Sequence, residues 1–198
     1  MTSRIVLASG NPGKLREFQQ LLASSGYDVV PQSEFSLESA EETGLTFVEN
    51  AILKARHASA ATGLPALADD SGIEVDALKG QPGIYSARFA GDGASDTANN
   101  QRLLELLQDV PAAQRTARYH CVLVFMQHSR DPTPVICHGT WEGRILMAPT
   151  GEGGFGYDPI FLVPDQQCSA AELSTEEKSQ LSHRAKAFQQ LISALPSV

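Results

Sequence analysis

The first third of the chain alternates between short apolar runs and a stretch with helical periodicity. Residues 4–9 (Arg-Ile-Val-Leu-Ala-Ser) form an apolar run without alternation, as is typical of a buried parallel strand. Apolar residues at helical spacing then predict an amphipathic helix over residues 14–24, ended by Gly26. Residues 27–30 predict a second strand. Strand, loop, helix and strand in this order favour an α/β fold.

The next segment contains a helix signal followed by a strand signal. Residues 46–49 (Thr-Phe-Val-Glu) have the spacing of a capping box and predict a helix to about residue 62, ended by Gly63. Residues 65–68 predict a strand that runs into the polar stretch 69–72 (Asp-Asp-Ser-Gly), where we expect it to end. Residues 73–78 then predict a separate short strand.

Two long strands are the clearest feature of the second half. Residues 119–127 and 135–145 are separated by a turn-rich segment and predict an antiparallel hairpin. Helices are predicted over residues 96–107, after the capping box at 174–177 and from residue 182 onward, and a strand is predicted over 159–163. The apolar side of the 96–107 helix contains Leu103, Leu106 and Leu107, and that of the last helix contains Ala185, Phe188, Leu191, Ile192 and Leu195.

Composition places the chain among ordinary globular proteins. It has 198 residues, of which 42% are hydrophobic and 19% charged, enough for one core and too few for two independent domains. Repeats, low-complexity tracts and linkers are absent from the sequence. We therefore expect a single α/β domain over residues 1–198, with a mixed sheet flanked by helices and two lobes around a cleft.

Charge and cysteine content exclude several classes of function. The formal net charge of −8 repels nucleic acid, so we expect a small-molecule ligand and no nucleic-acid partner. Three cysteines without a C-x-x-C pair encode neither a disulfide framework nor a zinc ribbon. The longest apolar runs, such as residues 121–126, are far shorter than a membrane span, and we expect no membrane partner and a cytoplasmic location.

The junction of the first strand and first helix is a candidate phosphate site. It reads Ser9, Gly10, Asn11, Pro12, Gly13 and Lys14. The start of a helix offers free backbone N–H groups and the positive end of its dipole, and a lysine there is unfavourable unless an anion binds. The alternative is an ordinary strand-to-helix turn.

Carboxylates at 69–70 are candidates for binding a metal. Asp69 and Asp70 lie where a strand is expected to end, and a carboxylate there suits a hard cation such as Mg²⁺. Glu38, Glu41 or Glu42 of the preceding acidic loop could add a second carboxylate. The alternatives are a turn capped by Asp and Ser, and a solvated run of charges.

A glycine-rich loop and a late pair of cations complete the candidate chemistry. Residues 153–159 (Gly-Gly-Phe-Gly-Tyr-Asp-Pro) allow close backbone approach to a flat ligand, and Phe155 offers a stacking face, unless it is only a hydrophobic plug. On one continuous helix, Lys178 and Arg184 would point in different directions. If Ser182 instead caps a new helix, His183 and Arg184 occupy its first turn and can point back toward Lys178.

Seven motifs in register resemble the inosine/xanthosine triphosphate pyrophosphatase family, and within it the bacterial dITP/XTP branch. They are Ser9–Lys14, Glu41–Gly44, Asp69–Gly72, Pro82–Ser86, Gly154–Asp158, Glu177–Ser179 and Ser182–Arg184. The resemblance implies an elongated mixed sheet between two lobes, a homodimer and Mg²⁺ dependence. It also implies hydrolysis of ITP, dITP and XTP to the monophosphate and pyrophosphate, which would clear deaminated purines from the nucleotide pool.

The resemblance assigns roles residue by residue. Asp70 would be the general base and, with Glu41, would hold the metal. Ser9, Gly10, Asn11, Pro12, Gly13 and Lys14 would hold the triphosphate, and Ser71 would contact substrate. The base, sugar and phosphates would be bound by Phe155, Gly156, Tyr157, Asp158, Lys178, His183 and Arg184, and Lys54 would add a further cation.

Two other functions stay open at this point. One is a related nucleotide pyrophosphatase that prefers pyrimidine or modified nucleotides. The other is a nucleotide-sensing module without turnover, although bare carboxylates beside phosphates give a binder little advantage. For base selection, we hypothesise that Arg184, which only donates hydrogen bonds, recognises the 6-keto group of hypoxanthine and xanthine against the 6-amino group of adenine.

Overall fold

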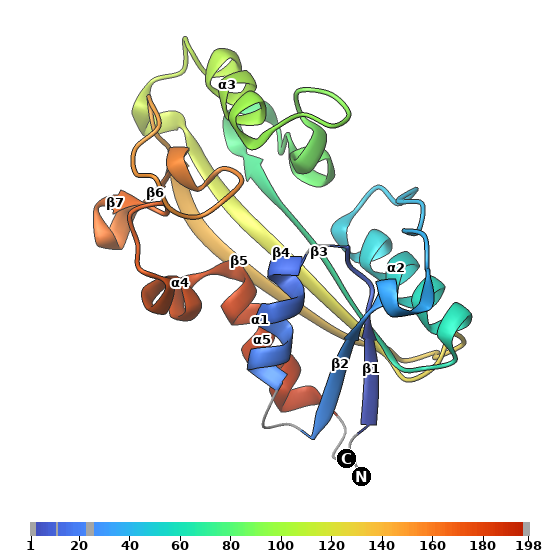
Figure 1. Cartoon of the computed structure of the whole chain (residues 1–198). Helices are drawn as coiled ribbons and strands as arrows, with labels where there is room; N and C mark the ends of the chain where they lie inside the picture. The colour runs from blue at the N-terminus through green and yellow to red at the C-terminus, as the bar shows by residue number, and fades with distance from the viewer. Residues whose placement is uncertain (1–2, 11, 23–25, 196–198) are drawn as a thin grey trace. The chain divides into compact units, whose positions relative to one another are not determined.

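A computed structural model describes residues 3–10, 12–22 and 26–195 (Figure 1). Over these residues it contains a mixed seven-stranded sheet of order β2-β1-β3-β4-β5-β6-β7. β1 is parallel to β2 and β3, whereas β6 is antiparallel to β5 and β7. The predicted α/β fold class with a mixed sheet and helices is therefore confirmed.

The elements follow one another in the order expected of an α/β chain. The strands are β1 (Ser3–Leu7), β2 (Tyr27–Pro31), β3 (Ala66–Val75), β4 (Thr116–Met126), β5 (Val135–Ile145), β6 (Phe161–Val163) and β7 (Cys168–Ser169). The helices are α1 (Pro12–Leu22), α2 (Phe47–Thr62), α3 (Asp96–Leu106), α4 (Thr175–Leu181) and α5 (His183–Ala194). In the described part of the chain, none of the helices is long and apolar enough to cross a membrane.

The chain forms two compact units, each built from separate segments. Unit 1 comprises Met1–Asp70, Val122–His138 and Ala187–Val198, and unit 2 comprises Ser71–Cys121 and Gly139–Lys186. The boundaries between the segments fall within β3 and β4, within β5 and within α5. That the whole chain is one domain stays a prediction.

Unit 1 is layered, with helices on both faces of its strands (Figure 1). Along β1, side chains alternate between the two faces, and Val6 packs into a core cluster that includes Ala51 and Ala55 of α2. On the opposite face, Phe18 of α1 meets Phe188 of α5, with ring centroids 5.8 Å apart. The end of β1 and the start of α1 are thus fixed by packing on both sides.

Unit 2 has an aromatic core. Tyr119 of β4 and Trp141 of β5 contact Phe161, with ring centroids 4.7 and 5.4 Å from it. Leu103 and Leu107, in α3 and at its end, are fully buried in the same cluster. This core supports the glycine-rich loop that precedes β6.

Most of the predicted elements are confirmed. Thr46 caps α2 and Gly63 ends it at a φ of +69°, a conformation that glycine adopts readily. β4 and β5 are neighbours in the sheet joined by residues 127–134, a connection too short for parallel strands, so they form the predicted hairpin.

Three details of the prediction were wrong. β3 does not end at 69–72 but runs on to Val75, beyond its pairing with β1 at Ala66 and Leu67, because it continues as the neighbour of β4 and its buried backbone outweighs the turn tendency of Asp, Ser and Gly. The strand predicted over 159–163 begins only at Phe161, after a 3₁₀ turn. Leu106 and Ile192, expected on buried faces, are 37% and 50% exposed.

Candidate functional site

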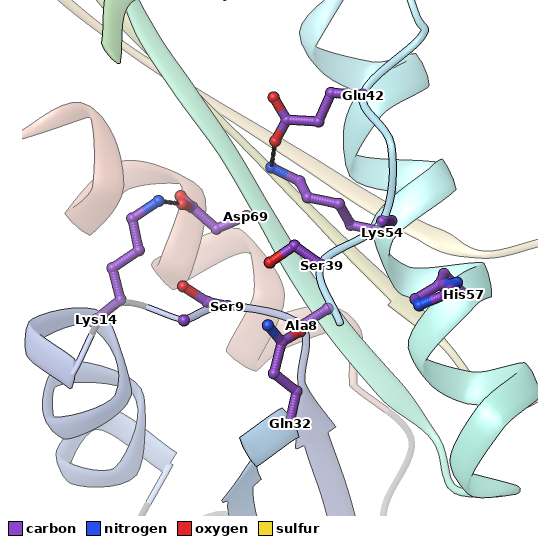
Figure 2. Close-up of a pocket in the computed structure, with 11 residues that line it drawn as sticks. Ala8, Ser9, Lys14, Gln32, Ser39, Glu42, Lys54, His57 and Asp69 are labelled. Carbon is purple, nitrogen blue, oxygen red and sulfur yellow. Dashed lines mark hydrogen bonds and ion pairs between the residues drawn. The ribbon is translucent and has the colours of Figure 1, made fainter. Parts of the chain in front are cut away.

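A pocket of about 240 Å³ lies in unit 1 where β1 leads into α1 (Figure 2). Residues from the strand end, the acidic loop, α2 and β3 surround it. They are Ala8, Ser9, Gly10, Lys14, Gln32, Ser39, Ala40, Glu42, Lys54, His57 and Asp69. Two lysines and two carboxylates therefore line one hollow, together with backbone near the start of α1.

Lys14 pairs with a carboxylate of the chain itself. Its ammonium contacts Asp69, as Figure 2 shows. The side chain of Asp69 is fully buried. This ion pair compensates a cation in the first turn of α1, where the helix dipole disfavours it. The position of Lys14 is therefore stable without an anionic ligand, and its charge alone does not prove that a phosphate binds.

Asp70 points the other way from Asp69, because successive side chains of the continuous strand β3 alternate between its faces. Asp70 Oδ1 accepts a hydrogen bond from Lys54 Nζ of α2 at 2.7 Å. Burial raises the pKa of the Asp70 carboxyl, and the nearby Lys54 ammonium opposes that rise only in part. A carboxylate with a raised pKa accepts a proton more readily than an exposed aspartate does.

Lys54 also joins Asp70 to the acidic loop. Its ammonium donates to Glu42 Oε1 at 3.1 Å, so two carboxylates meet around one positive charge. Glu41, the residue proposed from the family resemblance, is exposed. The loop is held by Gly44, whose N–H donates to Asn50 Oδ1 at 2.8 Å.

The carboxylate oxygens of Asp70 and the acidic loop are of the kind that binds a hard divalent cation. Carboxylate oxygens that converge on a positive charge are the ligands that Mg²⁺ prefers, and one or two of them suffice when waters and phosphate oxygens complete the shell. The described residues contain no cluster of three or more metal-ligating side chains. A site of the Mg²⁺ type is therefore compatible with Asp70 and the acidic loop.

In unit 2, the Asp158 carboxylate contacts the backbone of the glycine-rich loop and two neighbouring side chains. Its carboxylate accepts the Phe155 N–H at 2.9 Å and contacts the ammonium of Lys178 and, at 3.4 Å, the hydroxyl of Tyr119. A Cβ at Gly154 would clash with the Asp158 side chain, and the φ of +74° also favours glycine at this position. Asp158 is buried and ties the loop to α4.

Phe155 projects from this loop with 56% of its surface exposed. Two cations lie over its ring, Lys178 Nζ at 4.9 Å and Arg184 Cζ at 5.6 Å from the centroid. They reach the same ring because Ser182 separates α4 from α5 and its hydroxyl accepts the Ala185 N–H. The prediction that Ser182 caps a new helix is therefore confirmed.

His183, next to Arg184, stacks on the core. Its ring lies 4.7 Å from that of Tyr119 at an interplanar angle of 9°. Burial raises the pKa of Tyr119 well above its ordinary value. The start of α5 is thus fixed by aromatic packing, and with it the direction of Arg184.

Comparison with known proteins covers nearly the whole chain. Residues 5–194 match the Ham1 family. The chain belongs to the Ham1 family. A protein of Photobacterium profundum named dITP/XTP pyrophosphatase is 61% identical over 193 residues, which are 98% of this chain and 98% of that protein. The resemblance inferred from the seven motifs is therefore confirmed.

Solved structures of Ham1 proteins share the fold. The structure of a HAM1 protein from Coxiella burnetii matches with a TM-score of 0.93 and 52% identity, over 96% of this chain and 97% of that chain. A nucleoside-triphosphatase/dITP/XTP pyrophosphatase from Mycobacterium abscessus matches with a TM-score of 0.81 and 41% identity, over 95% of this chain and 98% of that chain.

Within this Ham1 fold, the candidate residues fall into two groups. In unit 1, Ser9, Gly10 and Lys14 line the pocket, Pro12 and Gly13 open α1, and Asp70 contacts Lys54. In unit 2, Phe155, Asp158, Lys178 and Arg184 form one cluster, beside Gly156, Tyr157 and His183, while Ser71 lies in β3. Asn11 lies outside the described residues.

Sequence reasoning missed two contacts in this Ham1 chain. It did not pair Asp69 with Lys14, and it did not single out Glu42 as the acidic-loop residue beside Lys54. The sequence does indicate that Asp69 and Asp70 point in opposite directions if the strand continues through them, and in β3 it does. Nothing in the local sequence distinguishes Glu42 from Glu41.

Proposed function

We propose that this chain is a nucleoside triphosphate pyrophosphatase that hydrolyses ITP, dITP and XTP to the monophosphate and pyrophosphate. The observation that carries the proposal is the juxtaposition, in unit 1, of a lysine-lined pocket with a buried carboxylate whose pKa is raised. Cations attract a triphosphate, and the carboxylate can accept a proton from attacking water. Family membership and the names of close relatives support the same activity.

The start of α1 is assigned to the phosphates. Backbone N–H groups at a helix N-terminus favour phosphate oxygens, and we assign the segment from Ser9 to Lys14 to this role, with Asn11, Pro12 and Gly13 as part of the turn; Pro12 itself has no N–H to donate. Lys14 is held beside the pocket by Asp69, so its charge is already in position when the substrate binds.

Asp70 is assigned as the general base. Burial raises its pKa, which strengthens it as a proton acceptor, and the hydrogen bond from the Lys54 ammonium opposes part of that rise. Asp70 and Glu41 would hold Mg²⁺, and Glu42 is close enough to Lys54 to take part. When bound, the ion would neutralise phosphate charge and acidify water.

Residues of unit 2 are assigned to the nucleoside end of the substrate. Phe155 offers an exposed ring on which a purine can stack, and Lys178 and Arg184 already lie against that ring. Arg184 can donate to a 6-keto oxygen and has no acceptor for the 6-amino group of adenine. Gly156, Tyr157, Asp158 and His183 shape this surface, and Ser71 is a further substrate contact.

The test is pyrophosphate release with Mg²⁺ from a panel of ITP, dITP, XTP, GTP, ATP, dTTP and UTP. We expect inosine and xanthosine nucleotides to dominate, and Asp70→Asn to lower kcat by about 10²-fold or more. Dominant activity on dTTP or UTP would instead identify a pyrophosphatase of different base preference. Tight nucleotide binding without turnover would identify a sensing module and refute the proposal.

The physiological setting follows from this activity. An enzyme of this kind acts on free nucleotides, so we place it with the nucleotide pool of the cytoplasm. The resemblance implies a homodimer, which light scattering coupled to size-exclusion chromatography tests directly.

A further inference from the structure

The exposed ring of Phe155 belongs to a loop whose backbone is tied down at several points. The Gly153 N–H donates to the carbonyl of Ala171 at 3.1 Å. The Tyr157 hydroxyl donates to the carbonyl of Ser86 at 2.7 Å. Asp158 accepts the Phe155 N–H, so hydrogen bonds hold the loop before, at and after Phe155.

Gly156, the residue after Phe155, is held by helix α3 through both of its backbone polar groups. Its N–H donates to Asp96 Oδ2 at 2.6 Å, and its carbonyl accepts from Asn100 Nδ2 at 3.1 Å. Asp96 and Asn100 are four residues apart and therefore lie on one face of the helix. We call this pair of contacts the α3 clamp.

The clamp fixes a conformation that the chain would not otherwise hold. Gly156 has a φ of +62°, one of several backbone conformations that glycine adopts with similar ease. Phe155 and Gly156 are joined by one peptide plane, whose N–H is the group that Asp96 binds. Asp96 thus holds the plane before Gly156, and Asn100 holds the plane after it, so the α3 clamp fixes the backbone that follows the Phe155 ring.

The Asn100 side chain donates to the Gly156 carbonyl although its own oxygen is buried at an energetic cost. It is 7% exposed, and its side-chain oxygen is buried without a hydrogen-bond partner in the described part of the chain. Burial of an unsatisfied amide oxygen is unfavourable, and an apolar side chain would avoid it. What the amide supplies here is its donor to the Gly156 carbonyl.

We propose that Asp96 and Asn100 are positioning residues for nucleobase binding, which act by holding the two peptide planes on either side of Gly156, the first of which includes the Phe155 carbonyl. The inference rests on the proposed function, because it assigns the Phe155 ring to the base. A pre-oriented ring loses less freedom when a base stacks on it, so the clamp favours binding and not the chemical step. Loss of the clamp is expected to raise KM and leave kcat nearly unchanged.

The experiment uses two isosteric variants with opposite expectations. Asp96→Asn keeps an acceptor for the Gly156 N–H, whereas Asn100→Asp replaces the donor to the Gly156 carbonyl with an acceptor. Asp96→Ala removes the contact, and Thr97→Ala, an exposed neighbour in the same helical turn, is the control. Thermal unfolding verifies that each variant is folded.

Two readouts are measured on the full chain. The first readout is hydrogen exchange of the free protein, followed in a peptide covering residues 153–158. It should be about tenfold faster in Asp96→Ala and Asn100→Asp and unchanged in Asp96→Asn and Thr97→Ala. KM for ITP should rise about tenfold in Asp96→Ala and Asn100→Asp, with kcat within about twofold of the parent. In Asp96→Asn, KM should stay close to that of the parent. In a Phe155→Ala background, Asp96→Ala should add little to KM.

Failure of the inference differs from failure of the proposed function. If Phe155→Ala raises KM but Asp96→Ala changes neither exchange nor KM, the clamp has no positioning role. An equal rise of KM in Asp96→Asn and Asp96→Ala, or full additivity with Phe155→Ala, overturns it too. If Phe155→Ala leaves KM unchanged, the assignment of this ring to the base is itself wrong.

Discussion

Asp69 and Asp70 should respond in opposite ways to the same substitution, because β3 carries them to different faces. In Asp69→Asn, the Lys14 ammonium loses the charge of a partner whose side chain is fully buried, while Lys14 itself is 20% exposed. Removing one partner of a buried pair costs about 3–5 kcal/mol, and access of Lys14 to water reduces this to about 2 kcal/mol. For a chain of this length, the melting temperature should fall by roughly 4–8 °C.

Asp70→Asn should leave stability unchanged or slightly higher. Burial raises the pKa of Asp70 in the folded state above its unfolded value, so at pH 7 its ionised form is disfavoured by folding. Removing that charge removes a destabilising contribution, and the asparagine oxygen can still accept from Lys54. Its effect should fall on kcat, whereas Asp69→Asn should mainly raise KM through a displaced Lys14.

The assay is thermal and urea unfolding at pH 7 in the presence of a chelator, so that divalent ions do not stabilise either variant. In a Lys14→Met background, Asp69→Asn should become neutral or stabilising, because it then removes a buried carboxylate that has lost the Lys14 charge. Equal losses of stability in the two single variants would refute the reasoning that the buried Asp70 charge lowers stability while the Asp69 charge raises it. An unchanged cost of Asp69→Asn when Lys14 is replaced would refute a stabilising role of the Lys14–Asp69 pair.

Three further predictions concern buried or loop-supporting groups. The guanidinium of Arg115, 1% exposed, donates to the carbonyls of three residues, so Arg115→Met should cost about 3–5 kcal/mol in urea unfolding and Arg115→Lys less. Hydrogen bonds from the N–H groups of Gln127 and Thr133 lower the pKa of Asp131, so this carboxylate stabilises the fold above its unfolded pKa and the effect is lost as pH falls through its folded pKa. Asp131→Asn should therefore destabilise at pH 7 by about 1 kcal/mol, and its difference from the parent should shrink below about pH 4. Arg184→Ala should lose most of the discrimination between ITP and ATP in pyrophosphate release, and an unchanged ratio would remove Arg184 from base selection.

Features fixed by a few neighbouring residues could be predicted from the sequence. The capping box at Ser174 and Glu177 forms as expected, and Gly63 ends α2 in the left-handed conformation. Each depends on contacts within about four positions, so the local pattern is sufficient. The same holds for Ser182, whose hydroxyl starts α5 and turns Arg184 toward Phe155.

Features that depend on distant pairing could not be predicted. The sequence of residues 69–72 has the composition of a turn, and it stays extended because β3 continues beside β4 in the sheet. The identity of the acidic-loop residue beside Lys54 depends in the same way on how the loop is held by Asn50, several residues away.

The continuity of β3 has a chemical consequence. A turn at 69–72 would allow Asp69 and Asp70 to approach the same ion, and two adjacent carboxylates would then compete for one role. The extended strand separates them, so that Asp69 is neutralised by Lys14 and holds a cation beside the pocket, while Asp70 faces Lys54. Because burial raises the pKa of Asp70 and its neighbour is paired with Lys14, only one of two identical side chains suits the proposed role of general base. The different partners of Asp69 and Asp70 therefore follow from strand alternation and not from residue type.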